Sequence, residues 1–276
     1  MYLHSFIRSL PGRPLIAFAL ALAAACFPAS GAVDLSQYDA GGTITVTHPD
    51  SSSLVVRWND KPGASYGATF NLDPSQPLLR VLEASPGTGA PVTVANDVDP
   101  RFRVTLGKRR PQTSWPYIFF ETIDTNQPAP VPHLSTLGLT GVKVISDSTS
   151  RVRIVFEGLN IGPYRGELTG IIYQGSPFIH FQASMRVTDP WVSYIHDSLF
   201  YSNFQTVSYK DKSGAPTTRA ASTLNTMPGE SAGLQVKHRT IMGAVSGGNG
   251  TLAVVAPPHA CVYPTDFSTN FGLVQA

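Results

Sequence analysis

Hydrophobic and polar residues alternate along most of this chain, and a period of two residues predicts β-strands rather than helices. The clearest case is the segment 178–187, in which ten consecutive residues alternate. One face of this predicted strand is apolar and carries Ile179, Phe181, Ala183, Met185 and Val187. The other face begins with Phe178 and continues with the polar residues His180, Gln182, Ser184 and Arg186.

The same period recurs in shorter runs that Gly and Pro residues separate. These runs are 43–47, 54–58, 68–72, 101–106, 117–123, 151–157, 165–173, 239–246 and 251–256. Gly247–Gly250 (GGNG) predicts a hairpin turn between the last two runs, because Asn-Gly favours the positive φ angles of tight turns. No window shows a sustained helical stripe. The pattern therefore predicts an all-β chain, a large antiparallel β-sandwich with few or no helices.

The N-terminal segment 1–32 has the pattern of a signal peptide. Arg8 and Arg13 precede a 13-residue apolar run, and Ser30 and Ala32 stand where a signal peptidase reads small residues. The run is too short to span a membrane, which needs roughly 20 apolar residues. We therefore expect cleavage near Ala32, a secreted or periplasmic protein, and no transmembrane helix in the mature chain. Lipoprotein anchoring at Cys26 is the alternative.

Residues 33–276 then form the mature protein, which we expect to be a single sandwich domain. Without the two leader arginines it has 18 basic and 18 acidic residues, and charged residues make up only 14% of the whole sequence. Such a neutral chain lacks the basic surface that nucleic acids require. Cys261 is its one thiol, which excludes an internal disulfide and a cysteine zinc site. The apolar ending, Phe271–Ala276, fits a piece of a longer architecture.

One segment matches a catalytic motif. Gly229–Gly233 (GESAG) has the G-x-S-x-G pattern of serine hydrolases, and His238, His259 and Asp266 lie downstream. However, Pro228 precedes the motif where a buried strand should end, and 234–238 alternates like a strand rather than a helix. We interpret the segment as a Gly-rich turn, with a serine hydrolase as the alternative.

The polar face of 178–187 is the main candidate for ligand binding. His180, Gln182, Ser184 and Arg186 would stand in a row, about 7 Å apart, and such a row suits a polyhydroxylated ligand. Residues two strands earlier would extend the surface: Arg151, Arg153 and Glu157. A solvated sheet face with no ligand explains the same alternation.

Aromatic residues beside polar or turn residues are a second candidate, because Trp and Tyr rings stack against the C–H faces of sugars. The set comprises Trp58, Trp115, Tyr117, Trp191 and Tyr194. Trp115 and Trp191 each adjoin a Pro in a predicted loop and are the most available, whereas core packing is the alternative for each.

Acid–base and metal sites have less support. His196 and Asp197 are adjacent, so in a strand they would point to opposite faces and could not pair. Glu121 and Asp124 are candidate carboxylates. The segment 96–99 predicts a loop with an Asx turn, with calcium binding as the alternative. We predict no metal and no cofactor.

The strand pattern and two short segments resemble a known fold family. The predicted strands around 152–156, 168–172 and 179–187, with Tyr194–Asp197 (YIHD) and Tyr263–Phe267 (YPTDF), resemble the galactose-mutarotase-like β-supersandwich of exported bacterial carbohydrate-active proteins. The resemblance covers about residues 40–276. It implies a domain of the kind found in carbohydrate epimerases, polysaccharide lyases and accessory regions of glycoside hydrolases. The His pair and the Glu of mutarotases have no matching motif here, so no catalytic residue carries over.

Three functions follow from these observations. The first is a carbohydrate-binding or accessory domain whose ligand residues include His180, Gln182, Arg186, Trp115, Trp191 and Arg153. The second is a polysaccharide lyase or glycoside hydrolase. In it His180, His196 and Tyr201 would act as base and acid, Arg186 would stabilise negative charge, or paired carboxylates would do the chemistry. The third is a structural cell-surface protein without a small ligand.

Overall fold

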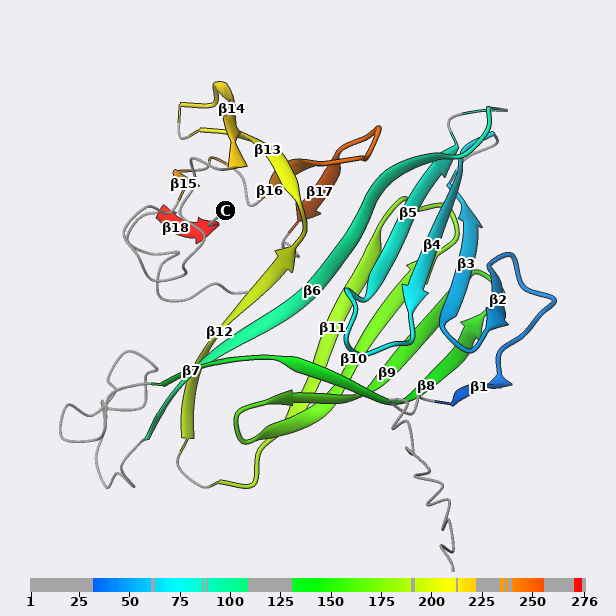
Figure 1. The fold of residues 1–276 in the computed structure, drawn as a ribbon, viewed down its shortest axis with the longest axis horizontal. Helices are drawn as coiled ribbons and strands as arrows, with labels where there is room; N and C mark the ends of the chain where they lie inside the picture. The colour runs from blue at the N-terminus through cyan, green and yellow to red at the C-terminus, as the bar shows by residue number, and fades with distance from the viewer. Residues whose placement is uncertain are drawn as a thin grey trace, which may run out of the picture.

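The protein is built almost entirely of β-strands (Figure 1). The computed structural model describes residues 32–60, 63–85, 87, 89–108, 131–189, 192–211, 213–221, 234–235, 237, 240–255 and 271–274. None of these residues forms an α-helix, and none of their segments is a helix that could cross a membrane. The all-β prediction is therefore confirmed.

Two sheets form the sandwich, and Figure 1 shows the green strands of one behind the blue and cyan strands of the other. Sheet A has the order β1 (Val33–Gln37), β8 (Thr136–Ser148), β9 (Arg151–Ile161), β10 (Tyr164–Tyr173) and β11 (Ile179–Arg186). Sheet B has the order β12 (Val192–Tyr201), β6 (Val92–Lys108), β5 (Leu79–Ser85), β4 (Ser65–Asn71), β3 (Ser53–Asn59) and β2 (Thr45–Asp50), and β7 (Val131–Leu134) also pairs with β6. Pairing is antiparallel except between β1 and β8, which are parallel.

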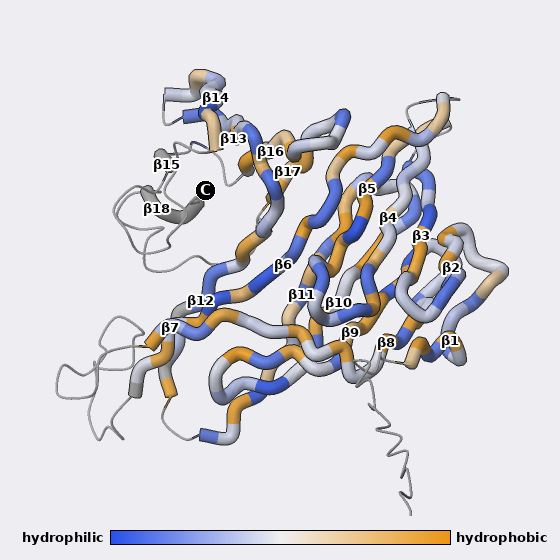
Figure 2. The backbone as a smooth tube through the Cα atoms, viewed as in Figure 1, coloured by the Kyte–Doolittle hydropathy of each residue, from blue (hydrophilic) through white to orange (hydrophobic). Residues whose placement is uncertain are grey.

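The core lies between the two sheets, because each strand turns its apolar face inward. Phe70 of β4 packs against Phe156 of β9, with ring centroids 5.3 Å apart, and both side chains are fully buried. Burying one such side chain stabilises the fold by about 1.5–3 kcal/mol. Along the strands of both sheets, hydrophobic and hydrophilic residues alternate (Figure 2). The sequence predicted this alternation, and the structure confirms the sandwich that it implies.

A third, C-terminal sheet continues from β12. Its order is β14 (Pro216–Ala220), β13 (Phe204–Lys210), β16 (Thr240–Val245) and β17 (Leu252–Val255), and a small pair is formed by β15 (Leu234–Gln235) and β18 (Phe271–Val274). Val245 belongs to the same buried cluster as the sandwich core. The C-terminal sheet therefore packs directly on the sandwich.

The predicted hairpin at Gly247–Gly250 is present between β16 and β17, but its geometry differs from the prediction. Only Gly247 has a positive φ, of 78°, so the Asn-Gly pair does not supply the left-handed residues. Gly248 is needed for a close approach, since a Cβ there would lie 2.3 Å from the carbonyl oxygen of Val94.

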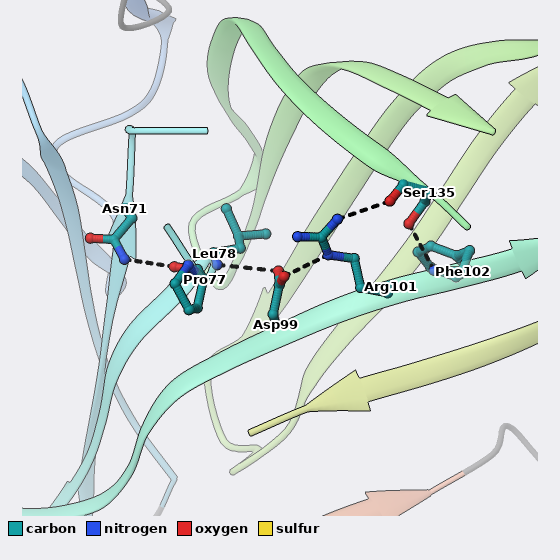
Figure 3. A network of polar contacts seen from close by, with 7 residues as sticks. All are labelled: Asn71, Pro77, Leu78, Asp99, Arg101, Phe102 and Ser135. Atoms are coloured by element: carbon teal, nitrogen blue, oxygen red, sulfur yellow. Dashed lines mark hydrogen bonds and ion pairs between the residues drawn. The ribbon is translucent and has the colours of Figure 1, made fainter. Parts of the chain in front are cut away.

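The chain crosses from sheet B to sheet A at Ser135, between β7 and β8. The Ser135 hydroxyl accepts a hydrogen bond from the Phe102 amide at 2.9 Å, and its carbonyl accepts one from Arg101 at 2.9 Å (Figure 3). Arg101 also pairs with Asp99 at 2.5 Å, and Asp99 accepts a hydrogen bond from the Leu78 amide. In this network each polar side chain has a partner, which fixes the crossing.

The segment 96–99 lies inside β6, so the predicted loop with an Asx turn is wrong. The reason is the length of β6, which runs through a position with a left-handed φ of 49° at Asp97. Its first half pairs with β5 and its second half with β12 and β7.

Candidate functional site

The outer face of sheet A carries the candidate site. In β11 the inward residues Ile179, Phe181, Ala183 and Met185 pack against the core, while His180, Gln182, Ser184 and Arg186 are exposed. Every residue of the predicted strand within β11 therefore lies on the face that the alternation assigned to it. This parity is fixed because a slip by one residue would expose the apolar face.

The three strands β9, β10 and β11 are consecutive neighbours, and their register brings the outward residues into rows. Thr169 of β10 is the cross-strand partner of Gln182, and Glu167 is the partner of Ser184. Ile171 lies between Arg153 of β9 and His180 of β11. The predicted extension of the polar row toward Arg153 is therefore present.

These rows line an open hollow of about 500 Å³ on the outer face of sheet A. Its lining residues come from four strands or their connections and are Asp147, Arg151, Arg153, Glu167, Thr169, Ile171, Gln182 and Ser184. The floor is deep because the central strand carries short side chains. Thr169 is only 6% exposed and Ile171 only 4% exposed, whereas longer side chains rise from the strands on either side. Ligand sites in proteins commonly have this volume.

One wall of the hollow is closed by ion pairs. Arg153 Nε donates its one N–H to both carboxylate oxygens of Asp147, at 2.9 and 2.8 Å, and Asp147 also pairs with Arg151 at 3.2 Å. The hydrogen bond from Arg153 lowers the pKa of the Asp147 carboxyl below its ordinary value, so this group is ionised at neutral pH. Arg151 lies over the Tyr173 ring at 5.3 Å, which places a 40% exposed aromatic ring beside the hollow.

The opposite side of the hollow carries polar groups that the protein itself does not use. Within the part of the chain that the structure describes, no hydrogen bond or ion pair engages the side chains of Thr169, Gln182, Ser184 or Glu167. Thr169 is the most buried of the four residues, at 6% exposed, and it lines the hollow. Among the described residues, the buried polar side-chain atom without a hydrogen-bond partner is Arg151 Nε. The four side chains can therefore bind a ligand without first breaking contacts of their own.

A second carboxylate stands next to Glu167. Glu157 of β9 is its cross-strand partner, and Glu157 pairs with Lys143 of β8 at 2.5 Å. Like charges directly opposite each other in a sheet are destabilising. Lys143 forms a contact ion pair with Glu157, whereas Glu167 interacts with Lys143 and Arg153 only at longer range.

The other predicted site residues lie outside the hollow, in the core or outside the described residues. His180 and Arg186 lie on the same outer face, at the two ends of β11, but do not line the hollow. Trp58 is 3% exposed and donates a hydrogen bond to the Ser176 carbonyl, so it is a core residue. Trp115, Trp191, Tyr117, Glu121 and Asp124 lie outside the described residues, as do the 229–233 motif, Cys26 and the leader through residue 31.

The predicted acid–base residues are not brought together. His196 of β12 lies on the face of β12 that carries Tyr194, with ring centroids 6.3 Å apart, and Tyr194 meets Tyr164 of sheet A. Asp197 pairs with Arg103 at 2.6 Å, which agrees with the prediction that it cannot pair with His196. Tyr201 has the opposite strand parity to His196, so the two side chains leave β12 on opposite faces.

Sequence reasoning missed Glu167, Thr169, Tyr173 and Asp147. The first three were within reach, because 165–173 is one of the predicted alternating runs, and in such a strand residues 167, 169, 171 and 173 share one face. Asp147 lies in a bulge between Ser146 and Ser148 near the end of β8, a strand that the alternation did not predict.

No group of three or more His, Cys, Asp or Glu side chains among the described residues is placed to hold a metal ion. No protein-family model matches the chain, and no curated protein matches it. The site therefore has to be interpreted from its own geometry.

Proposed function

We propose that this chain is an exported carbohydrate-binding β-sandwich that binds a glycan in the hollow on the outer face of sheet A. The observation that carries the proposal is the set of unused polar side chains, Glu167, Thr169, Gln182 and Ser184, around one open hollow. Hydroxyl, amide and carboxylate groups are the groups that form hydrogen bonds with sugar hydroxyls.

The shape and polarity of the hollow support a sugar over a fully apolar ligand. A pyranose ring has a C–H face and a rim of hydroxyls, so it needs an apolar contact surrounded by hydrogen-bonding groups. Ile171 supplies an apolar floor, and Tyr173 adds an exposed ring beside it. The surrounding walls are polar or charged. This arrangement also fits the resemblance to carbohydrate-active supersandwiches, which remains part of the proposal.

Export is the second part of the proposal and rests on the predicted signal peptide. Strand β1 begins at Val33, directly after the expected cleavage at Ala32, so processing there would leave every strand of the sandwich whole. N-terminal sequencing of the protein recovered from outside the cytoplasm tests this part. We expect Val33 as the first residue.

The binding proposal is tested by affinity gels that contain soluble polysaccharides. We expect one or two glycans to retard the purified protein. The double variant Q182A/S184A removes two exposed polar side chains from edge strand β11 and should weaken binding about tenfold, since two hydrogen bonds contribute about 0.5–1.5 kcal/mol each. The matched control is T45A/T47A, which removes two outward polar side chains from β2, the edge strand of sheet B.

Two outcomes would contradict the proposal. One is equal retardation of Q182A/S184A and the wild-type protein by the bound glycan, which would move the site elsewhere. The other is no retardation by any glycan together with stable self-association, which would favour the structural cell-surface function.

Glycoside hydrolysis is a second candidate, because Glu157 and Glu167 are cross-strand partners on the same face. Glycosidases use two carboxyl groups that flank the scissile bond, and a cross-strand pair brings two carboxylates to the same part of a sheet face. Release of new reducing ends from the bound glycan would support hydrolysis. Activity that persists in E157Q and in E167Q would exclude this pair.

A further inference from the structure

We infer that the hollow selects uncharged, hydroxyl-rich sugars and rejects acidic ones, and that Glu167 is the residue that sets this selectivity. The inference rests on the proposed function, because it concerns the ligand of the same site. It follows from two properties of the lining residues, their hydrogen-bonding capacity and their charge.

The hydrogen-bonding capacity of the lining residues favours a ligand that is rich in hydroxyl groups. A carboxylate only accepts hydrogen bonds, whereas hydroxyls and amides can both donate and accept. Glu167 therefore needs donors from the ligand, and Thr169, Gln182 and Ser184 can adapt to either role. The cationic groups of the hollow belong to Arg153 and Arg151, and each is already paired with Asp147 through its Nε. A sugar carrying neighbouring hydroxyls supplies the donors that Glu167 lacks.

The charge of the lining leads to the same conclusion. Arg151 and Arg153 are balanced by Asp147 and Glu167, so the hollow has no net charge. Among the described residues Glu167 forms no ion pair at contact distance, although Arg153 and Lys143 lie close enough to interact with its charge, and Glu157 stands directly opposite. A ligand carboxylate or sulfate placed over Thr169 would therefore meet the like charge of Glu167 at short distance.

The exposed positive charge of Arg186, near the hollow, would by itself favour an acidic ligand. The residue faces outward from β11 and is the cross-strand partner of Arg165. However, it stands two residues beyond Ser184, about 7 Å farther along the strand, and does not line the hollow. Arg165 is turned toward the carbonyls of Gly162 and Tyr164, to which it donates hydrogen bonds at 2.5 and 2.7 Å. The two arginines would attract an acidic ligand only outside the hollow.

The test uses whichever glycan retards the wild-type protein, prepared in two forms. One form is hydroxyethylated and neutral, and the other is carboxymethylated to the same degree and anionic, so that the two differ in charge more than in size. We expect the wild-type protein to bind the neutral form at least fivefold more tightly at low salt. E167Q should narrow this difference severalfold by binding the anionic form better. Its matched control, E83Q on the outer face of sheet B, should not.

The possible results separate glycan binding by the hollow from its selectivity for uncharged sugars. No retention by any glycan contradicts the proposed function itself. Retention with equal or tighter binding of the anionic form overturns the inference alone, and would point to Arg165 and Arg186. If the wild-type protein prefers the neutral form and E167Q keeps the same preference, Glu167 does not set the selectivity. A preference that persists unchanged in 1 M salt would contradict its electrostatic origin, because the Debye length is then only about 3 Å.

Discussion

The outer faces of the two sheets are built from similar residues but use them differently. On sheet B, Arg57 of β3 and Glu83 of β5 form an ion pair at 3.2 Å across the central strand β4. They meet above Gly67, where a Cβ would lie 2.9 Å from Glu83 Oε2 and 3.3 Å from Arg57. On sheet A, the ion pairs of Asp147 gather at one side, and the central strand carries Thr169 and Ile171 below an open hollow.

The difference shows how a sheet face becomes a binding site. Both faces alternate in the same way along the sequence, so alternation alone does not distinguish them. Sheet B uses its charged groups to satisfy one another across the central strand. Sheet A keeps Glu167, Thr169, Gln182 and Ser184 without partners among the described residues. Unused polar groups on a buried floor are the feature to look for, rather than polar groups as such.

The largest expected effect comes from replacing Gly166 of β10, in sheet A, with alanine. In G166A the new Cβ would lie 1.9 Å from the Ser184 carbonyl oxygen, so β10 and β11 would have to separate. We expect G166A to lose about 3 kcal/mol of unfolding free energy in urea denaturation, along with the hollow.

The paired variant on sheet B is G67A, whose new Cβ has its close contacts, at 2.9 and 3.3 Å, only with the flexible ends of Glu83 and Arg57. We expect it to change stability by no more than about 0.5 kcal/mol. If G166A were as stable as G67A, the described packing of β11 on β10 would be wrong.

A smaller effect is expected from the ion pairs of Asp147. Because the folded state lowers the pKa of this carboxyl, its contribution to stability is present at neutral pH and is lost as the pH falls below about 3.9 toward the folded-state value. D147N should therefore be about 1 kcal/mol less stable than the wild-type protein at pH 7, and this gap should close in strong acid. A gap that stays constant between pH 7 and pH 2.5 would contradict an origin in the ionised carboxylate.

The sequence could predict much of this fold because each strand has an inward and an outward face. Parity alone assigned Gln182 and Ser184 to the outer face, and the consecutive order of β9, β10 and β11 placed Arg153 on the same surface. The same reasoning applied to the run 165–173 would have included Thr169 and Glu167. These residues lie in the regularly paired strands β10 and β11, which a tight turn connects, so local sequence determines their register.

Other features depend on contacts that local sequence does not encode. The pairing of β6 with β12 and of β1 with β8 joins segments about 100 residues apart, and β1 is parallel to its partner. The ion pairs of Asp147 depend on a bulge near the end of β8. Trp58 was a candidate for sugar stacking, but the strand on which it lies turns it into the core. The hollow itself arises from side-chain lengths on neighbouring strands, which only the register brings together.

The central claim is that the hollow keeps unused polar groups for a ligand, and one pair of threonines tests it most directly. T169V removes the hydroxyl group of Thr169 from the floor of the hollow and retains the β-branched shape of the side chain. T69V makes the same change on the outer face of the central strand of sheet B. The measurement is glycan titration of the wild-type protein and both variants, with urea denaturation of the same samples.

We expect T169V to bind the glycan about fivefold more weakly, because it loses a hydroxyl at the floor of the hollow, and to differ from the wild-type protein by no more than about 0.5 kcal/mol in stability, because the β-branched shape is kept. T69V should match the wild-type protein in binding. If T169V binds as tightly as the wild-type protein, the hollow on sheet A is not the glycan site.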